Sequence, residues 1–450
     1  MRKRPAPNIA ISGLCLLFSF FALWEGPGLA RAGAIADSTE VPQAFRITPS
    51  RQSNFTVVDI SYNPKIDLYV IFYIERGNKD IAYSRLYNGK GQPKSGAQKI
   101  LEMDKLTISA LSAAYNARED RFLLIGTDMT YDAINGMVLD GRGRLPGGQP
   151  PIIIVKPTSG AGSTLMPKVH WIASTNQYAV TWTYYDGQKP SNARNGQYLT
   201  VLNSDFSRYL NPKRVKLQTM KNAFHVPFLA VLEDKLVWGS SEDGAGSGIK
   251  PVVWFTDFKG KIQTNIGAKG MIYPEGTAKT EMRVRPVYDP DHGRILLHWL
   301  YSDTLNTFES TYVESHYRMM DTRGRFKTGI RVVPKRESFQ YPGEACYNPT
   351  EKRFFWICSE YKILYKASPE RRFYGGKLWG FYLDDEGNLE DKMGNDKLDP
   401  IPLTNTFLDP SAGMIFDTIV HNSKDNSYLA VYEIERTATS ANECWGLIHK

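Results

Sequence analysis

Charged side chains recur at one position of a hairpin that the sequence repeats. The hairpin is an apolar run, a short polar turn and a second apolar run, as in residues 344–358, EACYNPTEKRFFWIC, and 59–73, DISYNPKIDLYVIFY. Each hairpin can be aligned on an aromatic or apolar residue just before its turn. Three residues before that residue, the seven hairpins hold Asp59, Ser112, Lys168, Phe228, Arg285, Glu344 and Thr418. Cations fixed on strands bind carboxylate or phosphate, and Arg does so in bidentate fashion. The pattern therefore predicts an anion site where the hairpins converge.

Strand alternation indicates which neighbours join this site. Residues two apart on a strand share a face, so Lys168 is grouped with His170 and Arg285 with Arg283. The intervening positions are apolar: Ile60, Ala113, Val169, Leu229, Pro286, Ala345 and Ile419. We therefore expect the polar face to line a channel, with Lys168, His170, Arg283, Arg285, Asp59 and Glu344 binding a ligand such as a uronate or sialate sugar. The alternative is a water-filled channel whose charges pair with each other, such as Arg285 with Glu344.

Convergence requires that the hairpins belong to one repeating architecture. The residues before the seven turns are Tyr62, Tyr115, Trp171, Val231, Tyr288, Tyr347 and His421, which gives a mean step of (421 − 62)/6, or about 60 residues. A third strand follows in most units and ends in a polar, Gly-bearing turn, as in VLDGRGR and MMDTRGR. A β-branched fourth strand comes next, as in PIIIVKP, and helical periodicity is not evident. Each unit therefore reads as four antiparallel strands.

A four-stranded unit repeated about every 60 residues predicts a seven-bladed β-propeller. The last unit lacks a fourth strand, because only ECWGLIHK follows its hairpin. Residues 41–50, VPQAFRITPS, precede the first hairpin and resemble the fourth strands. We expect this segment to pair with residues 444–448 and close the ring, since an unpaired edge invites aggregation.

The units resemble a widespread type of secreted β-propeller repeat, which reads roughly aYNp…d.yLvvW and then ld..G. The resemblance covers nearly all of the chain after its first 32 residues. It implies the fold and little about function, because such propellers include binding modules, scaffolds and enzymes. The sialidase Asp-box, the tryptophan docking motif of quinoprotein dehydrogenases and the WD dipeptide signature are not found in the sequence.

Acidic residues follow the second strand of every unit, namely Glu75, Asp128, Asp186, Glu242, Asp303, Glu360 and Glu433. Two carboxyl groups at a suitable separation could hydrolyse a glycoside, and a ring of them could hold Ca²⁺. Alternatively, they keep this face soluble. The insertion at 361–376, YKILYKASPERRFYGG, is basic and aromatic, which suits an anionic glycan or a partner protein as well as an ordinary surface loop.

The first 32 residues have the pattern of a secretory signal peptide. Arg2, Lys3 and Arg4 precede an apolar run at 9–24, and Ala30-Arg31-Ala32 matches a cleavage site. We expect cleavage before Gly33, leaving residues 33–450 as one propeller domain in a secreted or periplasmic protein. The alternative is an uncleaved membrane anchor.

Charge and cysteine content restrict the partners. Removing residues 1–32 lowers the formal net charge from +8 to +5, which is too mild and too dispersed to indicate nucleic acid. Cys346, Cys358 and Cys444 fit no zinc pattern. On adjacent strands, Cys346 and Cys358 would be about three residues out of register, or ~10 Å, which exceeds disulfide reach. No metal or cofactor is predicted.

The sequence thus favours a secreted, non-catalytic binding or scaffold propeller. It would recognise a protein or an anionic glycan at the face formed by the loops between second and third strands. The rival hypothesis is a glycan-active hydrolase or lyase that uses carboxylates of the same face.

Overall fold

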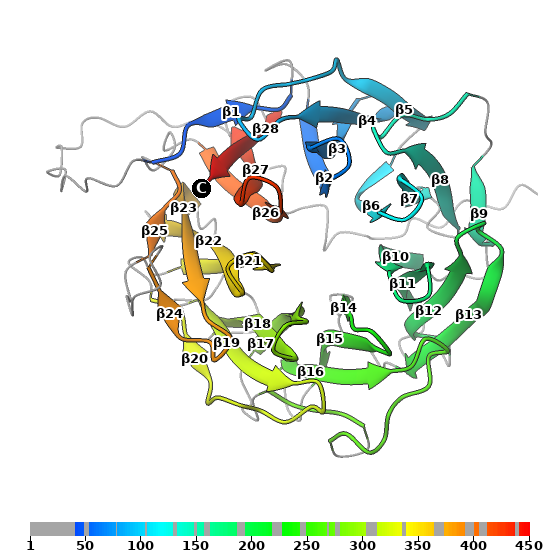
Figure 1. Cartoon of the computed structure of the whole chain (residues 1–450), viewed down its shortest axis with the longest axis vertical. Coiled ribbons are helices and arrows are strands. Elements are labelled where there is room, and N and C mark those ends of the chain that lie inside the picture. The colour runs from blue at the N-terminus through cyan, green and yellow to red at the C-terminus, as the bar shows by residue number, and fades with distance from the viewer. Residues whose placement is uncertain are drawn as a thin grey trace, which may run out of the picture.

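The strands form a seven-bladed β-propeller (Figure 1). The computed structural model describes residues 41–48, 54–77, 79–103, 106–128, 133–147, 151–156, 163–186, 194–217, 227–243, 249–267, 270–274, 280–302, 313–334, 339–363, 373–391, 400–404, 412–436 and 441–450. Residues 1–32, the predicted signal peptide, lie outside this part. Among the described residues, no helix has the length and apolarity that a bilayer crossing requires.

Each blade is built from strands that follow one another along the chain, and the seventh blade also includes β1. The first four blades comprise β2 (Asn54–Asn63), β3 (Leu68–Arg76), β4 (Asp80–Tyr87) and β5 (Gln98–Met103); β6 (Leu106–Asn116), β7 (Arg121–Asp128), β8 (Ile134–Asp140) and β9 (Ile152–Val155); β10 (Ser163–Ile172), β11 (Gln177–Tyr185), β12 (Gly196–Asn203) and β13 (Arg208–Leu217); and β14 (Phe228–Val231), β15 (Leu236–Asp243) and β16 (Ile249–Thr256).

The last three blades follow the same plan. They comprise β17 (Thr280–Asp289), β18 (Arg294–Ser302), β19 (Val313–Asp321) and β20 (Arg331–Val332); β21 (Phe339–Asn348), β22 (Arg353–Ile363), β23 (Phe373–Leu383), β24 (Leu389–Glu390) and β25 (Ile401–Pro402); and β26 (Ala412–Asn422), β27 (Ser427–Arg436), β28 (Ala441–His449) and β1 (Ala44–Arg46). The first strand of every blade is innermost in the ring (Figure 1).

The core lies between the blades rather than inside them. Seven clusters of buried apolar side chains occupy the seven seams, one between each pair of neighbouring blades. Trp238, Trp254, Trp299 and Trp356 are fully buried there, as expected for large rings at repeated strand positions. A single twisted sheet could not bury both of its faces, so the stacking of blades explains why the hairpin is repeated.

Closure of the ring occurs as predicted. Ala44 pairs with Leu447 and Arg46 with Trp445 across the antiparallel strands β1 and β28. Phe45 packs on Tyr87 of the first blade, with ring centroids 5.2 Å apart. A Cβ at Gly446 would lie 2.6 Å from Phe45 Cζ, so the close approach of the two strands requires glycine there.

The Asn of the repeated turn has two structural roles. Asn348 Oδ1 accepts hydrogen bonds from the backbone N–H groups of Thr350 and Glu351, at 2.9 and 3.1 Å, and so stabilises its own turn. Its Nδ2 donates to the side chains of Asn426 and Tyr428 in the next blade. The turn motif thus shapes each hairpin and also links it to its neighbour.

The turns between third and fourth strands are also uniform. Asp140, Asp257, Asp321 and Asp384 each accept backbone hydrogen bonds from the residues two and four places later. The fourth residue of these turns is a Gly with φ between +67° and +76°, which favours glycine. The Gly-bearing pattern in the sequence therefore has a conformational cause.

Two details refine the sequence predictions. The fourth blade has three regular strands in the described residues, and only isolated bridges, Val253 with Ile272 and Thr256 with Ile262, replace its outer strand. Cys358 lies opposite Pro342 and Cys346 opposite Phe355, three positions apart as expected. All three described cysteines are free.

Candidate functional site

The six predicted site residues belong to first strands, and bulges shape those strands beside them. The pairing register shifts between Leu165 and Lys168 in the third blade and between Met282 and Arg285 in the fifth. Arg283 has φ +63° within its bulge, a left-handed conformation that costs a non-glycine residue ~1–2 kcal/mol. Its N–H donates to Ser241 Oγ at 3.2 Å, which holds the bulge against the fourth blade. Bulges re-aim side chains in this manner.

Interactions between blades that are not neighbours place three of these side chains around the ring axis. Asp59 in the first blade interacts electrostatically with Lys168 in the third and Glu344 in the sixth. Because neither blade adjoins the first, the three side chains must approach one another across the centre of the ring. We call Lys168, His170, Arg283, Arg285, Asp59 and Glu344 the axial site.

The two carboxylates of the axial site are held by neutral donors. Asp59 accepts hydrogen bonds from Ala113 N at 2.8 Å, Ile60 N at 2.9 Å and Ser112 Oγ at 3.2 Å. Burial raises the pKa of Asp59 above its usual value, against the opposing effect of Lys168. Glu344 accepts a short hydrogen bond from Thr418 Oγ1 in the seventh blade. Both acids are therefore bound without a cation.

The cations are positioned by aromatic and backbone contacts. The Arg285 guanidinium carbon lies 4.9 Å from the centre of the Phe228 ring, a cation–π arrangement across two blades. Arg283 is exposed to solvent. Desolvation, and then the charge of Arg285, lower the pKa of Arg283, but a guanidinium remains charged at neutral pH.

His170 differs from the cations with which the sequence grouped it. Its partial burial, and then the positive charge of Lys168, lower the pKa of His170 to about 4. At neutral pH the imidazole is therefore uncharged and offers one donor and one acceptor. It contributes polarity to the axial site and not positive charge.

The predicted alternative of mutual charge pairing is not what the structure contains. Among the described residues, none of the six axial-site side chains forms an ion pair within 4.0 Å. In particular, Arg285 and Glu344 are not bonded to each other. Three cations therefore share the axial site with two carboxylates whose hydrogen bonds come from neutral groups.

One residue at this site was missed by the sequence reasoning. His298 of β18 lies directly opposite Arg285 in the strand register and is fully buried. The available signal was a lone polar residue in the apolar strand RILLHW. Only the pairing register of β17 with β18 places His298 beside Arg285, and the bulge at Arg283 shifts that register.

Most of the acids proposed for catalysis lie on strands and not in loops. Glu75, Glu242, Glu360 and Glu433 lie within β3, β15, β22 and β27, and Asp186 follows β11. Lys216 and Tyr273 bind Glu242, and Gln340 donates to the fully buried Glu360 at 3.1 Å. The Asp128 side chain and Asp303 lie outside the described part. No group of three or more His, Cys, Asp or Glu in the described part could hold a metal ion.

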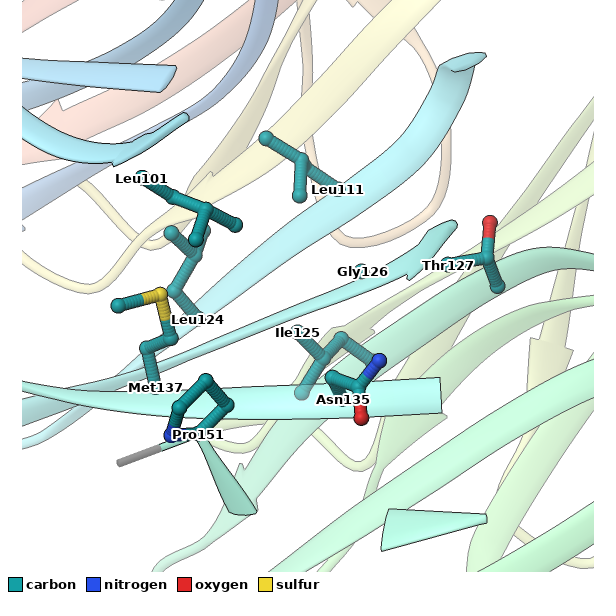
Figure 2. Close-up of a pocket in the computed structure, with 9 residues that line it drawn as sticks. All are labelled: Leu101, Leu111, Leu124, Ile125, Gly126, Thr127, Asn135, Met137 and Pro151. Carbon is teal, nitrogen blue, oxygen red and sulfur yellow. The ribbon is translucent and has the colours of Figure 1, made fainter. Parts of the chain in front are cut away.

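The predicted insertion extends the hairpin between β22 and β23, where Lys362 pairs with Tyr374 and Ile363 with Phe373. Its centre, 364–372, lies outside the described residues. A separate apolar pocket of about 200 Å³ lies in the seam between the first and second blades (Figure 2). Leu101, Leu124, Met137 and Pro151 are among its lining residues, and no axial-site residue lines it.

No protein-family model and no curated protein matches the sequence. Similar solved structures include the β-propeller domain of the Trilobed protease from Pyrococcus furiosus, at 10% identity and TM-score 0.47 over 88% of this chain and 95% of that one. Hydrazine synthase from Kuenenia stuttgartiensis gives 10% identity and TM-score 0.45 over 91% and 98%. Prolyl oligopeptidase B from Galerina marginata gives 10% identity and TM-score 0.43 over 86% of this chain. This chain covers 47% of that prolyl oligopeptidase.

Proposed function

We propose that this protein is a non-catalytic binding propeller that recognises an anionic glycan at the axial site. The carboxylate of a uronate or sialate residue would bind Arg283, Arg285 and Lys168. Hydroxyl groups of the same sugar would donate to Asp59 and Glu344, since a carboxylate accepts up to about four hydrogen bonds. The ligand is thus expected to combine one acid group with several donors.

The absence of ion-pair partners for the three cations, within the described residues, carries this proposal. Cations kept close together repel one another, and nearby acids would normally be expected to pair with them. Here Asp59 and Glu344 take their hydrogen bonds from Ser112, Ala113, Ile60 and Thr418 instead. Such an arrangement leaves the guanidinium groups available for an external anion.

Export is part of the proposal and rests on the sequence alone. A signal peptide at 1–32 would deliver the propeller to the periplasm or the medium, where acidic polysaccharides are encountered. The rival hydrolase or lyase would need two acids that converge on a sugar. The engagement of Glu242 by Lys216 and of Glu360 by Gln340 favours structural roles for these carboxylates.

A glycan array that contains uronates and sialates, each with its methyl ester, tests the proposal. We expect the acids to bind and the esters not to bind. The variant Arg283→Ala with Arg285→Ala should lose at least ~10-fold in affinity, because charge-assisted hydrogen bonds contribute about 1.5–3 kcal/mol each.

The matched control removes the same charge elsewhere. Arg142 and Arg323 are exposed residues in turns between third and fourth strands, and Arg142→Ala with Arg323→Ala should bind like the wild type. Equal losses in both double variants would show non-specific electrostatics. Binding to a protein from the native secretome, with no glycan bound, would replace the glycan by a protein partner.

A further inference from the structure

Behind Arg285, the seam between the fifth and sixth blades contains buried side-chain nitrogens that have no hydrogen-bond partner among the described residues. His298 is 0% exposed, and neither of its ring nitrogens has a hydrogen-bond partner among the described residues. It lies one strand further from the ring axis than Arg285, directly opposite it in the register. Its ring centroid is 4.9 Å from that of Trp356 in the sixth blade.

Arg285 and Trp356 add to this set. The Nε and Nη1 atoms of Arg285 are buried without a hydrogen-bond partner in the described part, and so is Nε1 of Trp356. Phe228 faces the guanidinium and offers its ring in place of an acceptor. We call Arg285, His298 and Trp356 the donor cluster.

The unpaired donors of the donor cluster destabilise the fold unless a bound group accepts their hydrogen bonds. Leaving a buried donor unsatisfied destabilises the fold, and the penalty is larger if the donor is charged. Native proteins pair more than nine in ten of such groups, and exceptions commonly mark a bound ion or water. Since Arg and Trp can only donate, a group that complements the cluster must be an acceptor.

The protonation state of His298 determines which charge the acceptor should carry. Burial, and then the nearby charge of Arg285, lower the pKa of His298 well below its usual value, so the ring is neutral. The cluster therefore carries a single positive charge, on Arg285. A group with one negative charge and two oxygen atoms matches one cation flanked by neutral donors, whereas a dianion would leave charge unbalanced in a buried place.

We infer that the donor cluster is the acid subsite of the axial site, in which a ligand carboxylate binds Arg285 and accepts a hydrogen bond from His298. The inference rests on the proposed function and deepens it, because it selects monoanionic carboxylated sugars over phosphorylated ones, which are mostly dianions at neutral pH. Arg283 and Lys168 then attract the ligand, and His298 acts as a specificity-determining residue.

The test uses the full-length protein, with sodium glucuronate as the probe and its uncharged methyl ester and the dianion glucose 6-phosphate as comparisons, all at equal ionic strength. We expect glucuronate to bind and the two comparisons to bind at least ~10-fold more weakly. His298→Phe, which keeps a ring and removes both nitrogens, should weaken glucuronate binding about 10-fold. His298→Gln, which keeps a donor and an acceptor, should retain more affinity than His298→Phe.

Stability separates a ligand role from a structural one. The unliganded His298→Phe variant should melt at or above the wild-type temperature, because it removes unsatisfied buried nitrogens. A lower melting temperature would show that the nitrogens bind a structural water, and would overturn the inference. If this variant does not fold, the ring ¹⁵N shifts of His298 in the wild type should move as glucuronate is added, and unchanged shifts would overturn it.

The outcomes also separate the two proposals. If glucuronate binds the wild type and His298→Phe equally, while Arg283→Ala with Arg285→Ala loses binding, the inference fails and the proposed function stands. If no acidic probe binds the wild type, both fail.

Discussion

Asn348 of the sixth blade donates a hydrogen bond of 2.8 Å from its Nδ2 to Oδ1 of Asn426 in the seventh blade. Asn426 has φ +55° and returns a bond from its own Nδ2 to Glu351. The second and third blades repeat this relationship with Asn116, Asn176 and Glu119. The turn motif therefore joins blades together, which explains why Asn recurs where a hairpin alone would accept several residues.

Asn348→Ala should cost more stability than a similar change in an isolated turn. The variant removes the acceptor of two backbone N–H groups and leaves the partly buried Asn426 and the buried Tyr428 of the next blade without this donor, so we expect a loss of about 2–4 kcal/mol. Asn88→Ala is the matched control, because Asn88 accepts from Lys90 and Gln92 in an exposed turn. Guanidinium unfolding midpoints measure both. Equal losses would mean that the links between blades contribute nothing.

The bulge at Arg283 can be tested apart from its charge. Arg283→Gly should preserve or raise the melting temperature, because glycine adopts φ +63° without the ~1–2 kcal/mol cost of a side chain. Arg283→Val should lower it, since a β-branched residue tolerates this conformation poorly. Met166, with φ +51° at the corresponding position of the third blade, supplies an independent pair of variants. Identical stabilities for Gly and Val would contradict the observed backbone.

Ring closure by β1 predicts a strong effect of a short truncation. Deleting residues 41–48 removes the pairing with β28 and the acceptor Ile47 O, which Arg85 Nη1 and Tyr87 OH both use. We expect a lower melting temperature for the whole propeller, measured by calorimetry. Phe45→Ala is a milder test and should cost about 2–4 kcal/mol, because Phe45 is half-buried. An unchanged melting temperature after the deletion would refute the role of β1.

His170 predicts a pH dependence of stability. Its pKa in the fold, about 4, lies below the usual 6.5, so folding favours the neutral ring. Its contribution is fully present above pH 6.5 and is lost as the pH falls toward 4. His170→Gln should flatten this part of the profile by roughly 1–3 kcal/mol, an upper range because the side chain is only partly buried. Chemical unfolding at several pH values measures the difference.

The repeat made the architecture predictable, while the details of the site were less so. Tyr62, Tyr115 and Tyr347 precede turns in both sequence and structure, because the turn chemistry is local. The grouping of the six site residues by strand alternation stays a prediction. Bulges then changed the pairing near Arg283, and a register shift between distant residues leaves no local signal.

Environment accounts for what the sequence could not predict. His170 was grouped with cations, but burial beside Lys168 keeps it neutral. Glu360 was expected in a loop, yet it lies inside β22 with Gln340 as its donor. Both outcomes depend on burial and strand pairing within the assembled ring, so composition and spacing do not reveal them.

The pairing of β1 with β28 also determines when the propeller can complete its folding. Cys444 N lies within hydrogen-bond distance of Thr48 Oγ1, across a separation of 396 residues. During synthesis β1 therefore cannot pair until β28 has left the ribosome. Its backbone hydrogen-bonding edge stays unpaired until then. Contacts so distant in sequence form slowly. A chain of this design should therefore benefit from a chaperone that shields its first strand until the last blade has folded.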